Sequence, residues 1–84
     1  MPEISRFFGI IIRMFYGDHQ PPHFHAVYGE YESLIEIDTF EVYRGVLPGR
    51  ALVLEGAALH RQELRQDWAL AATGEPPRPI APLQ

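Results

Sequence analysis

Three of the four histidines lie in one short segment, DHQPPHFHAVY, at residues 18–28. Side chains two residues apart on a β-strand point to the same side, so His23 and His25 can reach one divalent metal ion. Glu36, expected opposite His23, would supply a third ligand. The same residues could also be ordinary polar side chains on a solvated strand face. Whether the chain binds a cofactor is therefore left open, and a divalent metal ion is possible but not favoured.

The same imidazoles suit acid–base chemistry. Two histidines can hold opposite protonation states near neutral pH, and Arg13 can stabilise developing negative charge, which is the minimum set for metal-free RNA cleavage. A small hydrolase, RNA-cleaving or metal-dependent, would use His23, His25, Arg13 and Glu36 as its catalytic set. No nucleophile elbow, glycine-rich phosphate loop or HExxH motif accompanies them, so whether the chain is an enzyme stays open.

The rest of the segment is predicted to form a docking surface for a protein. Two adjacent prolines fix successive φ angles and delay the second strand until His23. A rigid proline pair beside aromatic residues is a surface that a partner can bind. This motif surface comprises Asp18, His19, Pro21, Pro22 and Tyr28. Asp18 and His19 lie on the approach to the strand and can also turn towards the two histidines.

Alternating apolar residues predict an antiparallel meander sheet of three to four strands over about residues 4–44. The expected strands cover about residues 9–16, 23–28, 32–38 and 40–44, with a weak leading strand at 4–7. Gly29-Glu30 is typical of a two-residue hairpin loop, which places Tyr28 opposite Tyr31 and sets the register of the pair. Phe24, Ala26 and Tyr28 then face the core, as do Met14 and Tyr16. The opposite face carries His23, His25, Arg13, Glu32 and Glu36.

One long helix is expected over about residues 50–72, opened by Leu47-Pro48-Gly49 and ended at Gly74. Its apolar stripe, which contains His60 as a structural histidine, would cover the core face of the sheet, away from His23 and His25. The stripe comprises Val53, Ala57, His60, Leu64, Trp68 and Ala71, flanked by Leu52, Leu59 and Leu70. The proline-rich tail, residues 75–84, is expected to be extended, with Ile80 and Leu83 as its anchors. The chain is predicted to be a single α+β domain, residues 1–84.

Composition narrows the classes of partner and compartment. The chain has no cysteine, so thiolate metal sites and disulfides are excluded, and its net charge is −4. Broad phosphate neutralisation is therefore not expected, and nucleic acid could bind only through a local arginine cluster. The apolar run at residues 7–12 is too short to cross a bilayer and lacks the features of a signal peptide. A cytoplasmic protein that does not bind membranes is expected.

Three segments together resemble a family of small bacterial proteins, domain of unknown function 4160. They are MPEISRFFGIIIRM, DHQPPHFHAVYGEY and ALHRQELRQDW, and PPHFHAxYG with a leading MPxISxF is the specific combination. The resemblance implies a small cognate protein partner, in an arrangement similar to toxin–antitoxin pairs, but no catalytic assignment. The leading expectation is thus a partner-dependent module acting through the PPHFH surface, and the alternative is the small hydrolase.

Overall fold

Five antiparallel strands form one meander sheet in the computed structural model, which describes residues 3–46 and 48–80. Neighbouring strands follow chain order: β1 Glu3–Phe7, β2 Ile10–Arg13, β3 His23–Tyr28, β4 Tyr31–Glu36 and β5 Val42–Gly45. The α+β class and the antiparallel meander are confirmed. The expected number of strands was too low, because both weakly patterned edge segments pair with their neighbours.

The β3–β4 hairpin has the register that the sequence predicts. Tyr28 pairs with Tyr31 across the Gly29-Glu30 turn, and Gly29 has a φ of 60°, which a residue without a Cβ adopts at little cost. His23 accordingly pairs with Glu36 at the other end of the hairpin. The prediction that Tyr28 belongs to the core is wrong, because this end of the hairpin projects into solvent and leaves 42% of Tyr28 exposed. Tyr16 is exposed for a related reason: β2 ends at Arg13, before it.

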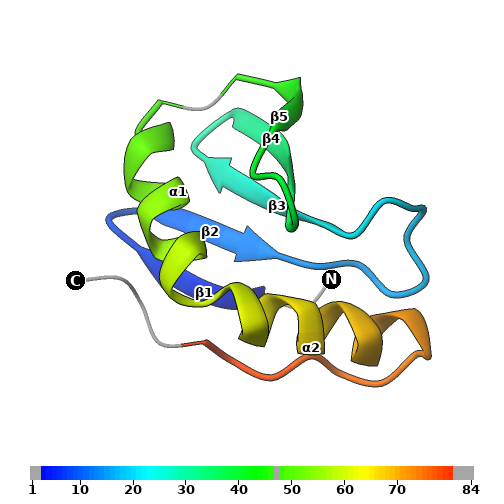
Figure 1. Cartoon of the computed structure of the whole chain (residues 1–84). Helices are drawn as coiled ribbons and strands as arrows, with labels where there is room; N and C mark the ends of the chain where they lie inside the picture. Colours follow the sequence, from blue (N-terminus) through cyan, green and yellow to red (C-terminus); the bar gives the residue numbers. More distant parts are fainter. Residues whose placement is uncertain (1–2, 47, 81–84) are drawn as a thin grey trace.

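Two helices replace the single predicted one: α1 Arg50–Leu59 and α2 Arg61–Ala72. They separate at His60, whose φ of −118° and ψ of 23° leave the helical region. Figure 1 shows the consequence, because α1 crosses the sheet and α2 turns to run along its lower end. Neither described helix has the length and apolarity needed to cross a membrane. Leu47, expected to open the helix, lies outside the described residues.

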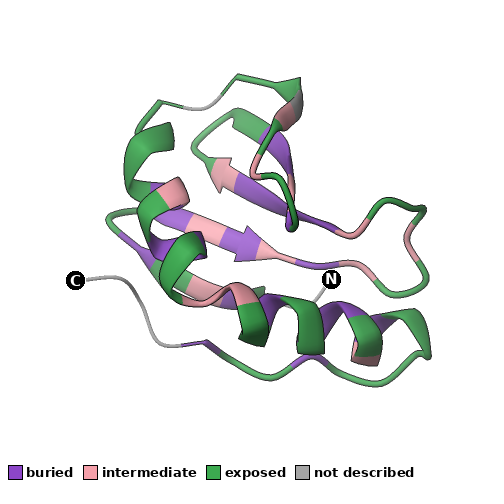
Figure 2. Cartoon of the chain, viewed as in Figure 1, coloured by how far each residue is buried: buried purple, intermediate pink, exposed green. Residues whose placement is uncertain are grey.

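The core lies between the sheet and the inner sides of both helices (Figure 2). The predicted stripe is buried at every position except His60, which is partly exposed. Its buried members are Val53, Ala57, Leu64, Trp68 and Ala71. The expected flanking contacts of Leu52 and Leu59 are absent, since these side chains are 40% and 72% exposed. Because the helical segment bends at His60, fewer of its side chains face the sheet than a single straight helix would present.

The tail packs along the edge of the fold as far as it is described. Ile80 is buried, and its N–H donates a hydrogen bond to the carbonyl oxygen of Ile4 on β1 (2.6 Å). The Arg78 N–H donates to Oδ1 of the buried Asp67 on α2 (2.8 Å). Ile80 is therefore an anchor, as predicted, whereas the second expected anchor, Leu83, lies outside the described residues.

Candidate functional site

The connection between β2 and β3, residues 14–22, extends past the end of the sheet on the side where α2 ends (Figure 1). Its first residue, Met14, is fully buried. The Gly17 N–H donates to the carbonyl oxygen of Ala71 in the last turn of α2 (3.0 Å). These two contacts hold the loop at its N-terminal side, so that Asp18 lies beside the first residues of β3.

Asp18 brings the two strand histidines together. Its Oδ2 lies 2.9 Å from Nε2 of His23 and 3.2 Å from Nε2 of His25. The two imidazoles share one face of β3, as strand alternation requires. The side chain of His23 is 0% exposed, that of His25 is 8% exposed and that of Asp18 is 15% exposed. The cluster is consequently almost closed to solvent.

The outward nitrogen of each strand histidine is also bound. His23 Nδ1 lies 2.8 Å from the carbonyl oxygen of Pro21, and His25 Nδ1 lies 3.0 Å from Oε2 of Glu32. A carbonyl or carboxylate oxygen only accepts, so each Nδ1 carries a proton and donates. The Asp18 carboxylate oxygen also only accepts, so the lone pair of each Nε2 becomes available when a metal ion takes the place of the proton between Nε2 and Asp18. Histidines that ligate metals commonly have this arrangement, with an oxygen acceptor on the remote ring nitrogen.

The carboxylate of Asp18 is held in its ionised form. Burial acts to raise its pKa, but the hydrogen bond from His25, the N–H of His19 and the charge of His23 together outweigh burial and keep the pKa below its ordinary value. Three atoms that can donate electron pairs, one carboxylate oxygen and two ring nitrogens, thus meet at one point. All three lie within 4.8 Å of one another. Such a point requires a positive charge, supplied either by protons on the rings or by a metal ion.

Aromatic rings form the walls of this cluster. Phe15 contacts His25 edge-on, with ring centroids 4.1 Å apart, and Trp68 of α2 lies 5.2 Å from the centroid of His23. The ring of His19 stacks on His23 at 4.9 Å. The expectation that His23 faces away from the helical layer is therefore wrong, because α2 wraps around the end of the sheet where β3 begins. These apolar walls lower the local dielectric and strengthen electrostatic interactions inside.

The other predicted site residues lie elsewhere. Glu36 pairs with His23 in the register, but its carboxylate accepts a hydrogen bond from Oγ1 of Thr39 (2.9 Å). Asp18 has the place beside the histidines that was expected for Glu36. Arg13 pairs with His25 across β2 and β3 and is half-buried. Pro21 is exposed, Pro22 is half-buried and Tyr28 lies at the opposite end of β3, so the predicted motif surface is not one continuous face.

Glu32 was predicted to lie on the histidine face but was not among the predicted site residues, and its carboxylate binds Nδ1 of His25. In the predicted register it lies diagonally across from His25 on the same face, within reach of a long side chain. The register therefore allowed this contact, although Glu36, directly opposite His23, was the expected site residue. Asp18 could be predicted only as one of several loop residues able to approach the histidines, because a loop has no strand register that fixes where its side chains point.

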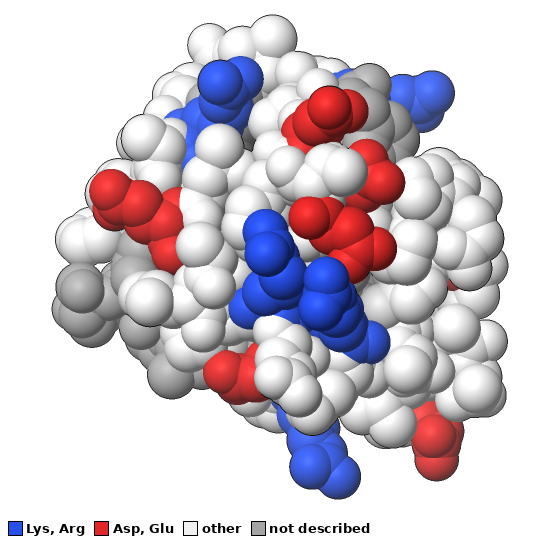
Figure 3. All heavy atoms as spheres, in the orientation of Figure 1, with Lys and Arg blue, Asp and Glu red and all other residues white. Residues whose placement is uncertain are grey.

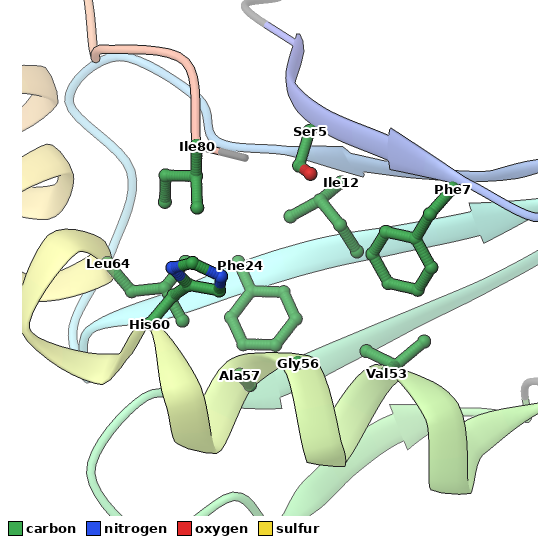
Figure 4. Close-up of a pocket in the computed structure, with 10 residues that line it drawn as sticks. All are labelled: Ser5, Phe7, Ile12, Phe24, Val53, Gly56, Ala57, His60, Leu64 and Ile80. Atoms are coloured by element: carbon green, nitrogen blue, oxygen red, sulfur yellow. The ribbon is translucent and has the colours of Figure 1, made fainter. Parts of the chain in front are cut away.

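A separate cavity lies on the other side of the sheet, enclosed by the sheet, α1, the start of α2 and the tail (Figure 4). Its volume is about 30 Å³, and its lining is apolar apart from Ser5 and His60. His60 Nδ1 binds the Glu63 carboxylate (2.6 Å), consistent with a structural histidine. A space of this size accommodates a water molecule and no substrate, so the cavity is a packing feature.

Basic and acidic side chains lie next to one another on the face shown in Figure 3. Two arginines have partners within the protein: Arg65 binds the carboxylate of Asp38 (2.8 Å), and Arg61 lies over the ring of Phe40, 4.2 Å from its centroid. Arginines engaged in this way are not aligned to contact a phosphate backbone.

Comparison with known proteins identifies a family but no individual relative. No curated protein and no solved structure matches the chain. A family model described as a domain of unknown function, DUF4160, matches residues 9–69. The match contains every residue of the Asp18, His23, His25 and Glu32 cluster, as well as His19. The chain belongs to the DUF4160 family.

Proposed function

We propose that the chain binds a divalent transition-metal ion, with zinc as the best-fitting class, through Asp18, His23 and His25. The observation that supports this proposal is the convergence of Nε2 of both histidines on one carboxylate oxygen, while each Nδ1 donates to another oxygen. Imidazole nitrogen with carboxylate oxygen is a donor set that zinc, iron(II) and cobalt(II) accept. Glu32 and the Pro21 carbonyl orient the two rings from behind.

The spacing of the ligand atoms suits such an ion. Ligands about 2.0–2.1 Å from a tetrahedral zinc ion lie about 3.3 Å from one another. Oδ2 of Asp18 lies 2.9 and 3.2 Å from the two Nε2 atoms. Both separations from Asp18 are within a few tenths of an ångström of that value, and all three atoms lie within 4.8 Å of one another. The ion would connect the β2–β3 loop to the sheet.

Burial distinguishes between the two forms of the hydrolase hypothesis. Metal-free RNA cleavage requires two histidines that touch a phosphodiester, and His23 and His25 are 0% and 7% exposed. A metal-dependent hydrolase needs only an open coordination position that a water molecule can occupy. Of the two enzyme forms, the metal-dependent one is the better supported, with Asp18 in place of Glu36.

Titration of the purified full-length chain with Zn²⁺ after chelator treatment tests the metal proposal. We expect one equivalent to bind with a micromolar or lower Kd, and at a free concentration of 100 Kd the ion should stabilise the fold by about 2.7 kcal/mol. For a chain of this size that corresponds to a rise in Tm of roughly 10–20 °C.

Zn²⁺ affinities of single-residue variants identify which side chains bind the ion. Asp18→Asn and His25→Gln should each weaken Zn²⁺ binding by at least about tenfold, the smaller of the losses known for changes around metal ligands. His60→Gln is the matched control, because His60 lies on the other side of the sheet and should leave the affinity unchanged. Circular dichroism checks that each variant is folded. No stoichiometric uptake by the wild-type protein, or equal affinity in all variants, would exclude the site.

A second candidate function, binding of a small cognate protein in a cytoplasmic toxin–antitoxin-like pair, is favoured by a different observation. Large apolar side chains gather at the end of the sheet opposite to the metal cluster. This hairpin-end patch consists of Phe8, Tyr28, Tyr31 and Val46, which are 65%, 42%, 46% and 74% exposed. Exposed apolar side chains that cluster commonly mark protein interfaces.

Several contacts support the continuity of the hairpin-end patch. Tyr28 pairs with Tyr31, and the backbone of Gly9, next to Phe8, approaches the ring of Tyr28. Gly45, next to Val46, pairs with Ser33 on β4. The partner's surface should accordingly be apolar.

Capture of the full-length chain with a candidate small cognate protein, co-expressed with it, tests the partner proposal. We expect a one-to-one complex that Tyr31→Ser disrupts and that Leu59→Ser, an equally polar change at an exposed leucine on α1, leaves intact. A complex that survives changes at both Tyr28 and Tyr31 would refute the hairpin-end patch as the interface.

A further inference from the structure

His19 is the third histidine of the segment, and its ring is directed at the same carboxylate. Its Nε2 lies 3.7 Å from Oδ1 of Asp18, whereas His23 and His25 approach Oδ2. Its Nδ1 lies 3.1 Å from the carbonyl oxygen of Gln20. A carbonyl oxygen only accepts, so Nδ1 of His19 donates and the lone pair is on Nε2. All three imidazoles therefore use Nδ1 for an oxygen acceptor and direct Nε2 towards Asp18.

The His19 ring is stacked on His23 and has to turn before it can act as a ligand. The interplanar angle is 25° and the centroids are 4.9 Å apart, so the two rings are nearly parallel. An imidazole binds a metal ion in its own plane, so the His19 ring has to leave this stack before it and His23 can share one ion. Unlike the buried strand histidines, the side chain of His19 is 62% exposed, which leaves its torsions free to adjust.

The backbone of His19 is already fixed beside the site. Its N–H donates a hydrogen bond to Oδ1 of Asp18 (2.8 Å), and the preceding Gly17 is held by the Ala71 carbonyl oxygen. Only the side chain has to move. Its Nε2 lies 3.7 Å from Oδ1 of Asp18, whereas the strand histidines approach Oδ2, so the ring has to rotate towards Oδ2 to complete the site.

We propose that His19 is the fourth protein ligand, giving a tetrahedral site of three histidines and one aspartate. This inference rests on the proposed metal site and specifies its coordination. Four protein ligands are typical of structural zinc sites, whereas catalytic sites keep one position for water. The ion then orders the β2–β3 loop against β3 and α2, and the protein does not use it to hydrolyse a substrate.

Cobalt(II), added alone to the chelator-treated full-length chain, tests the coordination because its visible spectrum reports the number and geometry of the ligands. We expect the wild-type complex to give the intense absorption of a tetrahedral ion. His19→Ala should still bind one equivalent, but at least about tenfold more weakly, since even changes outside the ligands cost about 10–100-fold. Free imidazole should restore the wild-type spectrum to His19→Ala and leave the wild-type protein unchanged. His60→Ala serves as the control.

The outcomes separate this inference from the site on which it rests. If wild-type protein and His19→Ala bind Co²⁺ with the same Kd and spectrum, His19 is not a ligand, and the three-residue site stands with an open position. If added imidazole changes the wild-type spectrum, the fourth position is open and the closed site is refuted. If the wild-type protein takes up no Co²⁺ or Zn²⁺, the metal proposal itself is wrong.

Discussion

Replacing Asp67 by asparagine is expected to stabilise the protein near neutral pH. Asp67 lies on α2 with 2% of its surface exposed, and its Oδ1 accepts the Arg78 N–H at 2.8 Å. Its Oδ2 is buried and has no hydrogen-bond partner among the described residues. Burial raises the pKa of this carboxyl; the Arg78 N–H opposes that effect, and the nearby charge of Glu63 adds to it.

The sign of the pH dependence follows from the raised pKa. The folded protein holds the Asp67 proton more tightly than the unfolded chain does, whose pKa is near 3.8. The stability contributed by Asp67 is therefore complete below that pH and is lost as the pH rises through the folded-state pKa. Asparagine keeps the acceptor for Arg78 and never ionises. The gain in the free energy of unfolding should grow between pH 4 and pH 7 and reach about 1 kcal/mol, the cost typical of a poorly satisfied buried polar group.

Urea unfolding followed by the fluorescence of Trp68, the only tryptophan, measures this difference at each pH. Contributions from other carboxyl groups cancel when the variant is compared with the wild-type protein. Glu55→Gln on the exposed side of α1 is the control and should show no growing difference. Parallel pH profiles for Asp67→Asn and the wild-type protein, or a less stable variant at pH 7, would refute the reasoning.

Three further substitutions test the packing by urea denaturation. Gly45→Ala should lower the free energy of unfolding by at least about 2 kcal/mol, because the φ of 85° is unfavourable for an L-residue and a Cβ there overlaps the carbonyl oxygen of Glu32. A loss below about 0.5 kcal/mol would contradict this. Ser33→Ala removes a fully buried hydroxyl that has no partner among the described residues, and should be neutral or stabilising by up to about 1 kcal/mol; a clear loss would indicate a hidden hydrogen bond. Ile80→Ala should cost about 2–3 kcal/mol if the tail is part of the core, and almost nothing if it is not.

The hairpin shows what local pattern can predict. A two-residue turn at Gly29-Glu30 and the alternation of apolar residues were sufficient for every pair of the β3–β4 register. Burial at Tyr28 was not predictable in the same way, because it depends on how far the helices extend over the sheet. The break at His60 was missed for a similar reason: the helical periodicity continues through it, and only the backbone torsions reveal it.

The cluster of Asp18, His23 and His25 could likewise be predicted only in part. From the sequence alone it follows that His23 and His25 share a face, since strand geometry depends on neighbouring residues only. The third member, Asp18, was one of several loop candidates, and Glu36 was the expected choice. The fold of residues 14–22 against α2 decided it, through the contact of Gly17 with Ala71.

The amino-acid sequence by itself determined the α+β class, the β3–β4 register and the family, because these depend on short-range periodicity and on residue order. The tertiary structure alone decided which groups meet: Asp18 between two imidazoles, Glu32 behind one of them, and Trp68 against the other. The geometry of these contacts depends on how the β2–β3 loop closes and, for Trp68, on the packing of a helix far away in the chain. The pattern in the sequence predicted two histidines on one face, and the tertiary structure adds the carboxylate on which both converge.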